Sequence, residues 1–176
     1  PMMRPLLIDY PDDPQVYDIE DEYLFGRDIL VAPILAEHAE NRDVYLPDGR
    51  WIDFFTHREY DGGRSIRYEC KWETFPVFVR AGTVIPLNLN QAFEMGGSIG
   101  NELDRYQMLT FWVTGTMELP WRFSDERGNT VRIRNEGDRI TAFIEGPAGE
   151  AFVLANETMD IAGDEIGPGL WRFYAE

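Results

Sequence analysis

The sequence has few of the residues that build disulfides, zinc sites and histidine-based active sites. Its 176 residues include a single cysteine, Cys70, and two histidines, His38 and His57. One cysteine excludes an internal disulfide and a cysteine-rich zinc site, and it neither requires nor excludes an oxidising compartment. Neither histidine has a partner at the spacing of a metal ligand. We therefore interpret both histidines as surface or packing residues.

Positive charge is also scarce. There are 16 Lys and Arg residues against 32 Asp and Glu residues, which gives a formal net charge of −16. Nucleic acid and anionic membrane surfaces attract basic faces, so this balance argues against both as partners. No apolar stretch approaches the roughly 20 residues that cross a bilayer, and the first residues do not read as a signal peptide. The sequence predicts a soluble acidic protein, cytoplasmic or secreted, whose charge is compatible with a neutral sugar.

Catalytic motifs are missing as well. Residues 96–100 are glycine-rich but lack the Lys-Ser/Thr pair and the βαβ unit of a phosphate-binding loop. Ser65, Ser98 and Ser124 do not follow the pattern of a hydrolase nucleophile elbow. The acidic run at residues 18–22 reads as the solvated face of a short helix rather than as a catalytic carboxylate pair. We therefore expect no catalytic residue, no cofactor and no metal site in this chain.

The chain opens with a short apolar segment. Residues 2–9 form an apolar run bounded by prolines, which predicts a fully buried strand, as in a parallel sheet covered on both faces. Asp13 is a candidate N-cap with Pro14 in the first turn, and Gly26 suits the end of a helix. We expect one or two short helical turns between residues 12 and 26.

From residue 28 onward the pattern is one of strands and turns without intervening helices, which predicts antiparallel β-sandwiches. A tight hairpin turn is expected at residues 47–50, a second turn at 61–63, and a hairpin turn at 125–129, where the glycine position does not suit a calcium loop. In residues 88–104 apolar residues no longer recur at a regular spacing, and we place a linker at 91–104. The expected strands are 29–34, 44–46, 51–55, 65–69, 75–79, 83–87, 108–113, 118–123, 130–134, 139–144, 151–154 and 170–174.

The five tryptophans have two interpretations. They lie at positions 51, 72, 112, 121 and 171. An aromatic face can stack on a pyranose ring, whereas in a β-sandwich it more often fills the core. The candidates for sugar stacking are Trp51, Trp72 and Trp112.

Four stretches together point to one protein family. They are residues 1–6 (PMMRPL), 21–33 (DEYLFGRDILVAP), 44–54 (VYLPDGRWIDF, followed by Gly62-Gly63) and 76–86 (PVFVRAGTVIP). In this order they resemble the C-terminal end of glycoside hydrolase family 31, the group of α-glucosidases and α-xylosidases. The second half matches less closely, and its best feature is residues 123–128 (FSDERG).

The resemblance implies an architecture for the whole chain. Residues 1–26 would be the remnant of an upstream (β/α)8 catalytic barrel, 27–90 a proximal β-sandwich, 91–104 a linker and 105–176 a distal β domain. Because the chain begins with Pro1-Met2, we expect it to be either processed or a piece of a longer protein. Family members are retaining enzymes with two catalytic aspartates, whose motifs precede the last barrel strand and have no counterpart here. No catalytic residue is therefore carried over, and Arg4 is expected to form a structural ion pair.

These observations support one leading function and two alternatives. The leading hypothesis is a non-catalytic C-terminal fragment that braces the barrel of a retaining α-glycosidase, whose substrate is a carbohydrate. One alternative is a free-standing carbohydrate-binding β-sandwich module, and the other is a free-standing interaction protein. Without barrel neighbours, residues 1–9 are expected to be disordered, to fold back on the sandwich or to mediate self-association.

Overall fold

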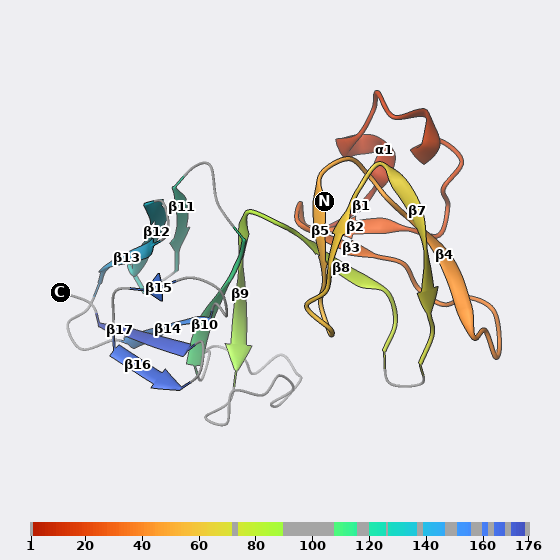
Figure 1. Ribbon diagram of the computed structural model, residues 1–176. Helices are drawn as coiled ribbons and strands as arrows, with labels where there is room; N and C mark the ends of the chain where they lie inside the picture. The colour runs from red at the N-terminus through yellow and green to blue at the C-terminus, as the bar shows by residue number, and fades with distance from the viewer. Residues whose placement is uncertain are drawn as a thin grey trace. The chain divides into compact units, whose positions relative to one another are not determined.

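The computed structural model consists mainly of strands, with two short helical segments near the N-terminus (Figure 1). The described residues are 2–71, 74–89, 108–115, 120–125, 127–136, 139–146, 151–155, 160–161, 164–167 and 170–174. The chain divides into two compact units, Pro1–Ala81 and Gly82–Glu176. The mainly β, antiparallel class predicted from the sequence is confirmed. No helix within the described ranges has the length and apolar character needed to cross a bilayer.

The first unit is built from a six-stranded and a two-stranded antiparallel sheet. Its elements are β1 (Met3–Pro5), α1 (Leu6–Asp9), a 3-10 helix η1 (Pro14–Val16), β2 (Tyr23–Phe25), β3 (Ile29–Val31), β4 (Asn41–Leu46), β5 (Arg50–Asp53), β6 (Glu59–Asp61), β7 (Arg64–Glu69) and β8 (Val77–Arg80). The large sheet has the order β1-β2-β3-β8-β5-β6, and the small one pairs β4 with β7.

Apolar side chains from both sheets form the core of this unit. Leu30, Trp51 and Phe78 come from the large sheet, and Val44 and Leu46 come from the small one. All five are completely buried. The two sheets therefore enclose a common core, as the sandwich prediction required.

Residues 41–69 form one long hairpin that is folded over a corner. Its first arm is β4 followed by β5, and its second arm is β6 followed by β7. Strand β4 pairs with β7 in the small sheet, whereas β5 pairs with β6 in the large sheet. Residues 47–50 therefore lead from one sheet into the other, and the prediction of a tight hairpin turn there is wrong.

The corner is closed by backbone contacts between the two arms. The N–H of Gly62 donates to the carbonyl oxygen of Gly49 at 2.7 Å. A Cβ at Gly62 would overlap the carbonyl oxygen of Pro47, so the close approach of the arms requires glycine there. The hairpin loop itself lies at residues 54–58, where Asp53 Oδ1 accepts hydrogen bonds from two backbone N–H groups of the loop.

The N-terminal segment differs from the single buried strand that was predicted for residues 2–9. Only Met3–Pro5 is a strand, and it forms the edge of the large sheet beside β2. After Pro5 the chain makes one helical turn, α1, in which Leu6 is buried while Leu7 and Ile8 are exposed. An apolar run does not show which of its members reach the core, and here only Leu6 does.

The helical turns predicted between residues 12 and 26 are reduced to η1. Asp13 caps η1 as expected, because its carboxylate accepts a hydrogen bond from the N–H of Gln15. Residues 23–25, however, form strand β2. Gly26, with φ of 69°, turns β2 into β3 instead of ending a helix.

The second unit contains a five-stranded and a four-stranded sheet. Its strands are β9 (Thr83–Leu89), β10 (Met108–Thr114), β11 (Trp121–Ser124), β12 (Thr130–Glu136), β13 (Arg139–Glu145), β14 (Ala151–Ala155), β15 (Asp160–Ile161), β16 (Asp164–Gly167) and β17 (Leu170–Tyr174). The sheet orders are β16-β17-β14-β10-β9 and β11-β12-β13-β15. Val84, Phe111 and Phe152 of the first sheet share a core with Ile133 and Ile140 of the second.

The pairing of β9 places this strand in the second unit, so the first unit ends before it. Strand β9 pairs with β10 over seven residues, from Thr83↔Thr114 to Leu89↔Met108. It therefore belongs to the second unit, whereas the sequence analysis placed the domain boundary near residue 90. The predicted linker at residues 91–104 lies outside the described residues, and the domain division as a whole stays a prediction.

Candidate functional site

Of the three sugar-stacking candidates, Trp51 is buried and cannot offer its face to a sugar. Its exposed fraction is 0%, and its Nε1–H donates to the carbonyl oxygen of Pro47 at 2.8 Å. The guanidinium of Arg80 lies over its ring, 5.2 Å from the centroid. The stacking prediction for Trp51 is corrected: this indole packs the core and holds the corner of the long hairpin.

The other two candidates are not decided by the structure. Trp72 lies outside the described residues. Trp112 is half-buried in β10, between Ile85 of β9 and Ala155 of β14 in the sheet register. Sugar stacking at Trp72 and Trp112 therefore stays a prediction.

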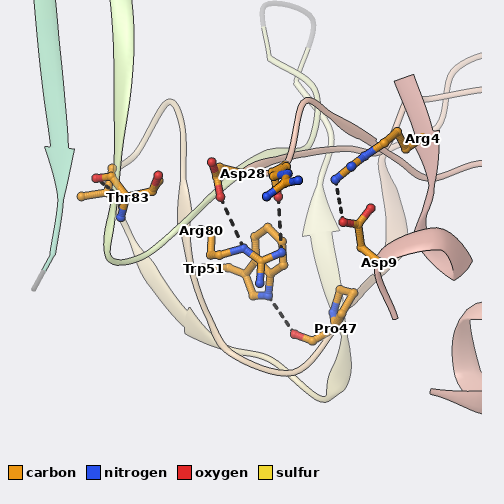
Figure 2. A network of polar contacts seen from close by, with 9 residues as sticks. Arg4, Asp9, Asp28, Pro47, Trp51, Arg80 and Thr83 are labelled. Atoms are coloured by element: carbon orange, nitrogen blue, oxygen red, sulfur yellow. Dashed lines mark hydrogen bonds and ion pairs between the residues drawn. The ribbon is translucent and has the colours of Figure 1, made fainter. Parts of the chain in front are cut away.

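Arg80 is the centre of a polar network at the end of β8 (Figure 2). Its Nε lies 3.6 Å from Asp28 Oδ1, and its Nη2 donates to the carbonyl oxygen of Arg27 at 3.3 Å. One ring on β5, Trp51, and one ring after α1, Tyr10, lie within 5.2 and 5.5 Å of its guanidinium carbon. Arg80 thus connects four parts of the first unit: β8, β5, the β2–β3 turn and the N-terminal segment.

A second ion pair joins the beginning and the end of the N-terminal segment. Arg4 Nη2 donates to Asp9 Oδ1 at 2.6 Å, and the two side chains are 13% and 22% exposed. Figure 2 shows this pair between β1 and the end of α1. The structural ion pair expected of Arg4 is present. Tyr10, the next residue, is mostly buried, and burial raises the pKa of its hydroxyl against the lowering effect of Arg80.

An exposed apolar face lies on the same segment. We define the apolar face as five exposed apolar residues that lie just before β1 or within β1, α1 and β2: Met2, Met3, Leu7, Ile8 and Phe25, which are 69%, 56%, 44%, 56% and 44% exposed. Met3 and Phe25 are direct partners in the β1–β2 pair. Several exposed apolar side chains on one segment make that segment a candidate interaction surface, whereas single exposed apolar residues need no explanation.

Glu22 is a buried acid that the sequence analysis missed. It was interpreted as part of the solvated face of a helix, but residues 18–22 are not helical and Glu22 is only 6% exposed. Its Oε1 accepts a hydrogen bond from the N–H of Tyr45 at 2.9 Å, and burial raises its pKa to about 7. The helix-face interpretation is therefore wrong for this residue.

The loop at residues 125–129 is a hairpin turn, as predicted. It joins β11 and β12, with Ser124 paired to Thr130. Asp125 Oδ1 accepts hydrogen bonds from the N–H groups of Arg127 and Asn129, both at 2.9 Å. The carboxylate thus shapes the turn. Within the described ranges, no group of three or more His, Cys, Asp or Glu side chains is placed to hold a metal ion.

Comparison with known proteins accounts for the sequence patterns of the first unit. The model of the glycosyl hydrolase family 31 C-terminal domain matches residues 1–85. Residues 1–85 belong to this family 31 domain. The family resemblance inferred from the four stretches is therefore confirmed.

Relatives in family 31 extend the similarity beyond residue 85. The isomaltosyltransferase of Sporosarcina globispora is 39% identical over 134 residues, which cover 75% of this chain. Alpha-glucosidase 2 of Bacillus thermoamyloliquefaciens is 30% identical over 154 residues, or 87% of this chain. The chain spans only 12% and 19% of the length of these two proteins.

A solved family 31 structure covers both units of the fold. The cycloalternan-forming enzyme from Listeria monocytogenes, in complex with a pentasaccharide substrate, superposes with a TM-score of 0.75 and 30% identity. The match covers 93% of this chain and 17% of that enzyme. The chain is therefore similar to a small part of much larger enzymes, among them an alpha-glucosidase.

Proposed function

We propose that this chain is the non-catalytic C-terminal part of a retaining α-glycosidase, and that it braces the catalytic barrel of the same polypeptide. The observation that carries the proposal is the family 31 C-terminal domain over residues 1–85, in a chain that spans a fifth or less of its relatives. Hydrolysis of an α-glucoside by retention needs two carboxyl groups about 5 Å apart across the sugar. The sequence offers no candidate for such a pair, so the chemistry is assigned to the larger polypeptide.

The apolar face supports a bracing role. Its five side chains lie just before β1 or on β1, α1 and β2, and the N-terminal segment is held by the contact of Arg80 with Tyr10 and by the Arg4–Asp9 pair. Rigid support keeps an active site close to its productive geometry, and apolar surface is what a permanent domain contact buries. We assign this face to the contact with the catalytic barrel.

Self-association is the competing use of the same face. Strand β1 is the edge of the large sheet, and an unpaired edge can recruit a second copy. Sizing of the isolated chain across a range of concentrations distinguishes the two uses. A stable dimer whose formation depends on Met3 and Phe25 would assign the face to self-association instead of the barrel.

Activity measurements test the proposed function. The 176-residue chain should give no turnover above background on an aryl α-glucoside, whereas the longer polypeptide encoded by its gene should release the aryl group with retention of configuration. Turnover by the isolated chain would overturn the proposal. A coding sequence without an upstream catalytic domain would also overturn it, and would favour the carbohydrate-binding module.

A further inference from the structure

A buried carboxyl group joins the two sheets of the first unit. Glu22 directly precedes β2 of the large sheet, and its side chain is 4% exposed. Its Oε1 accepts a 2.9 Å hydrogen bond from the N–H of Tyr45, which lies in β4 of the small sheet. Its Oε2 is buried and has no hydrogen-bond partner among the described residues. The protein therefore gives this carboxyl group one amide donor where water would supply several.

The cation that faces Glu22 is shared with other acceptors. Arg42 Nη2 lies 3.6 Å from Glu22 Oε1 but 2.9 Å from Asp21 Oδ2, and Arg42 Nη1 donates to the carbonyl oxygen of Pro33. Asp21 adds a negative charge beside the buried carboxyl. On the β4 side, the hydroxyl of Tyr45 donates to Asp13 Oδ2 at 2.7 Å, which places a further carboxylate at the far end of that ring. Arg42 thus compensates Glu22 only in part.

The balance of these groups favours the neutral acid. Burial raises the pKa of Glu22 from 4.5 to about 7, while the N–H of Tyr45 and Arg42 lower it and Asp21 raises it. Between these two pH values the folded chain keeps a proton that the unfolded chain has released. Because the folded state binds more protons in this window, the free energy of unfolding falls as the pH rises through it.

We propose that Glu22 is a proton-dependent lock that fastens the segment of residues 13–22 to β4. In its neutral form the carboxyl group bridges the two sheets without an unpaired buried charge. In its ionised form, Oε2 carries charge that needs water, so the segment loosens from β4 to admit it. Residues 13–22 connect the N-terminal segment with β2, so the lock sets how firmly the apolar face is held: tightly in mild acid and more loosely above neutrality.

A pH series of urea unfolding midpoints tests the lock with Glu22→Gln, which is permanently neutral. The unfolding equilibrium constant of the wild-type chain should rise by up to about tenfold per pH unit between pH 5 and 7 because of this group. Glu22→Gln should lack that dependence, match the wild type near pH 5 and exceed its midpoint at pH 8. The control, Glu20→Gln, removes an exposed carboxyl two positions away and should follow the wild type.

Two further measurements test directly whether Glu22 titrates near neutrality and whether its ionisation loosens β4. The side-chain carboxyl carbon of Glu22, followed by NMR, should titrate with a midpoint near 7. At pH 8 the amide hydrogen of Tyr45 should exchange faster in the wild type than in Glu22→Gln. A Glu22 midpoint near 4.5, or parallel pH dependences for Glu22→Gln and the wild type, overturns the proposal. The NMR titration decides the question even if Glu22→Gln does not fold.

Discussion

At the scale of single residues, burial decides what each candidate side chain can do. Trp51 has an aromatic face suited to a sugar, but that face is covered by Arg80 and its Nε1–H is bonded to the carbonyl oxygen of Pro47. The planar guanidinium of Arg80 suits its contacts with the rings of Trp51 and Tyr10. These residues stabilise the attachment of the N-terminal segment, and no ligand is needed to explain them.

Trp51→Phe should lower the free energy of unfolding by about 2–3 kcal/mol. The change leaves the Pro47 carbonyl without its buried donor and leaves a small cavity beside Arg80. Chemical denaturation measures the loss. The matched control is Phe143→Leu, because Phe143 also lies under an arginine, Arg134, but is 53% exposed, so its loss should stay under about 1 kcal/mol. Equal losses for the two variants would show that Trp51 is not held as described.

The local sequence does not reveal which acidic residue becomes buried. Nothing local separates Glu22 from the exposed Glu20, since both belong to one acidic run. Glu22 is buried because β4, more than twenty positions further along the chain, places the N–H of Tyr45 against it. The sequence predicted that Arg4 forms an ion pair, but it did not identify the partner. Asp9 reaches Arg4 only because the chain makes the helical turn α1.

At the scale of elements, the strands were largely predictable and their partners were not. Alternating apolar residues and turn residues indicated β4, β5, β7 and β8, and the sandwich class followed from their spacing. The corner at residues 47–50 was mistaken for a hairpin turn because Pro, Asp and Gly serve both purposes. Only the pairing of β4 with β7 and of β5 with β6 shows that the chain changes sheets there.

Gly62→Ala should destabilise the first unit by about 3 kcal/mol or more, because its Cβ would overlap the carbonyl oxygen of Pro47. Gly63→Ala is the matched control. At Gly63, φ is 70° and a Cβ meets nothing within 4 Å, so only backbone strain of about 1–2 kcal/mol is expected. Thermal unfolding of both variants gives the comparison. If Gly62→Ala costs no more than Gly63→Ala, the arms of the hairpin do not approach each other as closely as described.

At the scale of the whole molecule, the chain combines a strongly acidic composition with the exposed apolar residues of the apolar face. A net charge of −16 favours solubility and keeps copies apart, so exposed apolar residues on the N-terminal segment call for a specific partner. The family match, the short span relative to the relatives and the contact of Arg80 with Tyr10 of the N-terminal segment agree with a contact inside a larger enzyme. The family resemblance already predicted that the chain is part of a larger enzyme. The sequence pattern, however, predicted a strand over residues 2–9, of which only Met3–Pro5 is one.

Amide hydrogen exchange, compared between the isolated chain and the proposed longer polypeptide that contains the catalytic barrel, tests the central claim most directly. In the longer polypeptide the amides of residues 2–9 and 23–25 should exchange at least about tenfold more slowly, because the apolar face is covered there. Strand β6, Glu59–Asp61, is the opposite edge of the same sheet and should be unchanged. Equal exchange of residues 2–9 and 23–25 in the two forms would contradict the assignment of this face to the catalytic barrel.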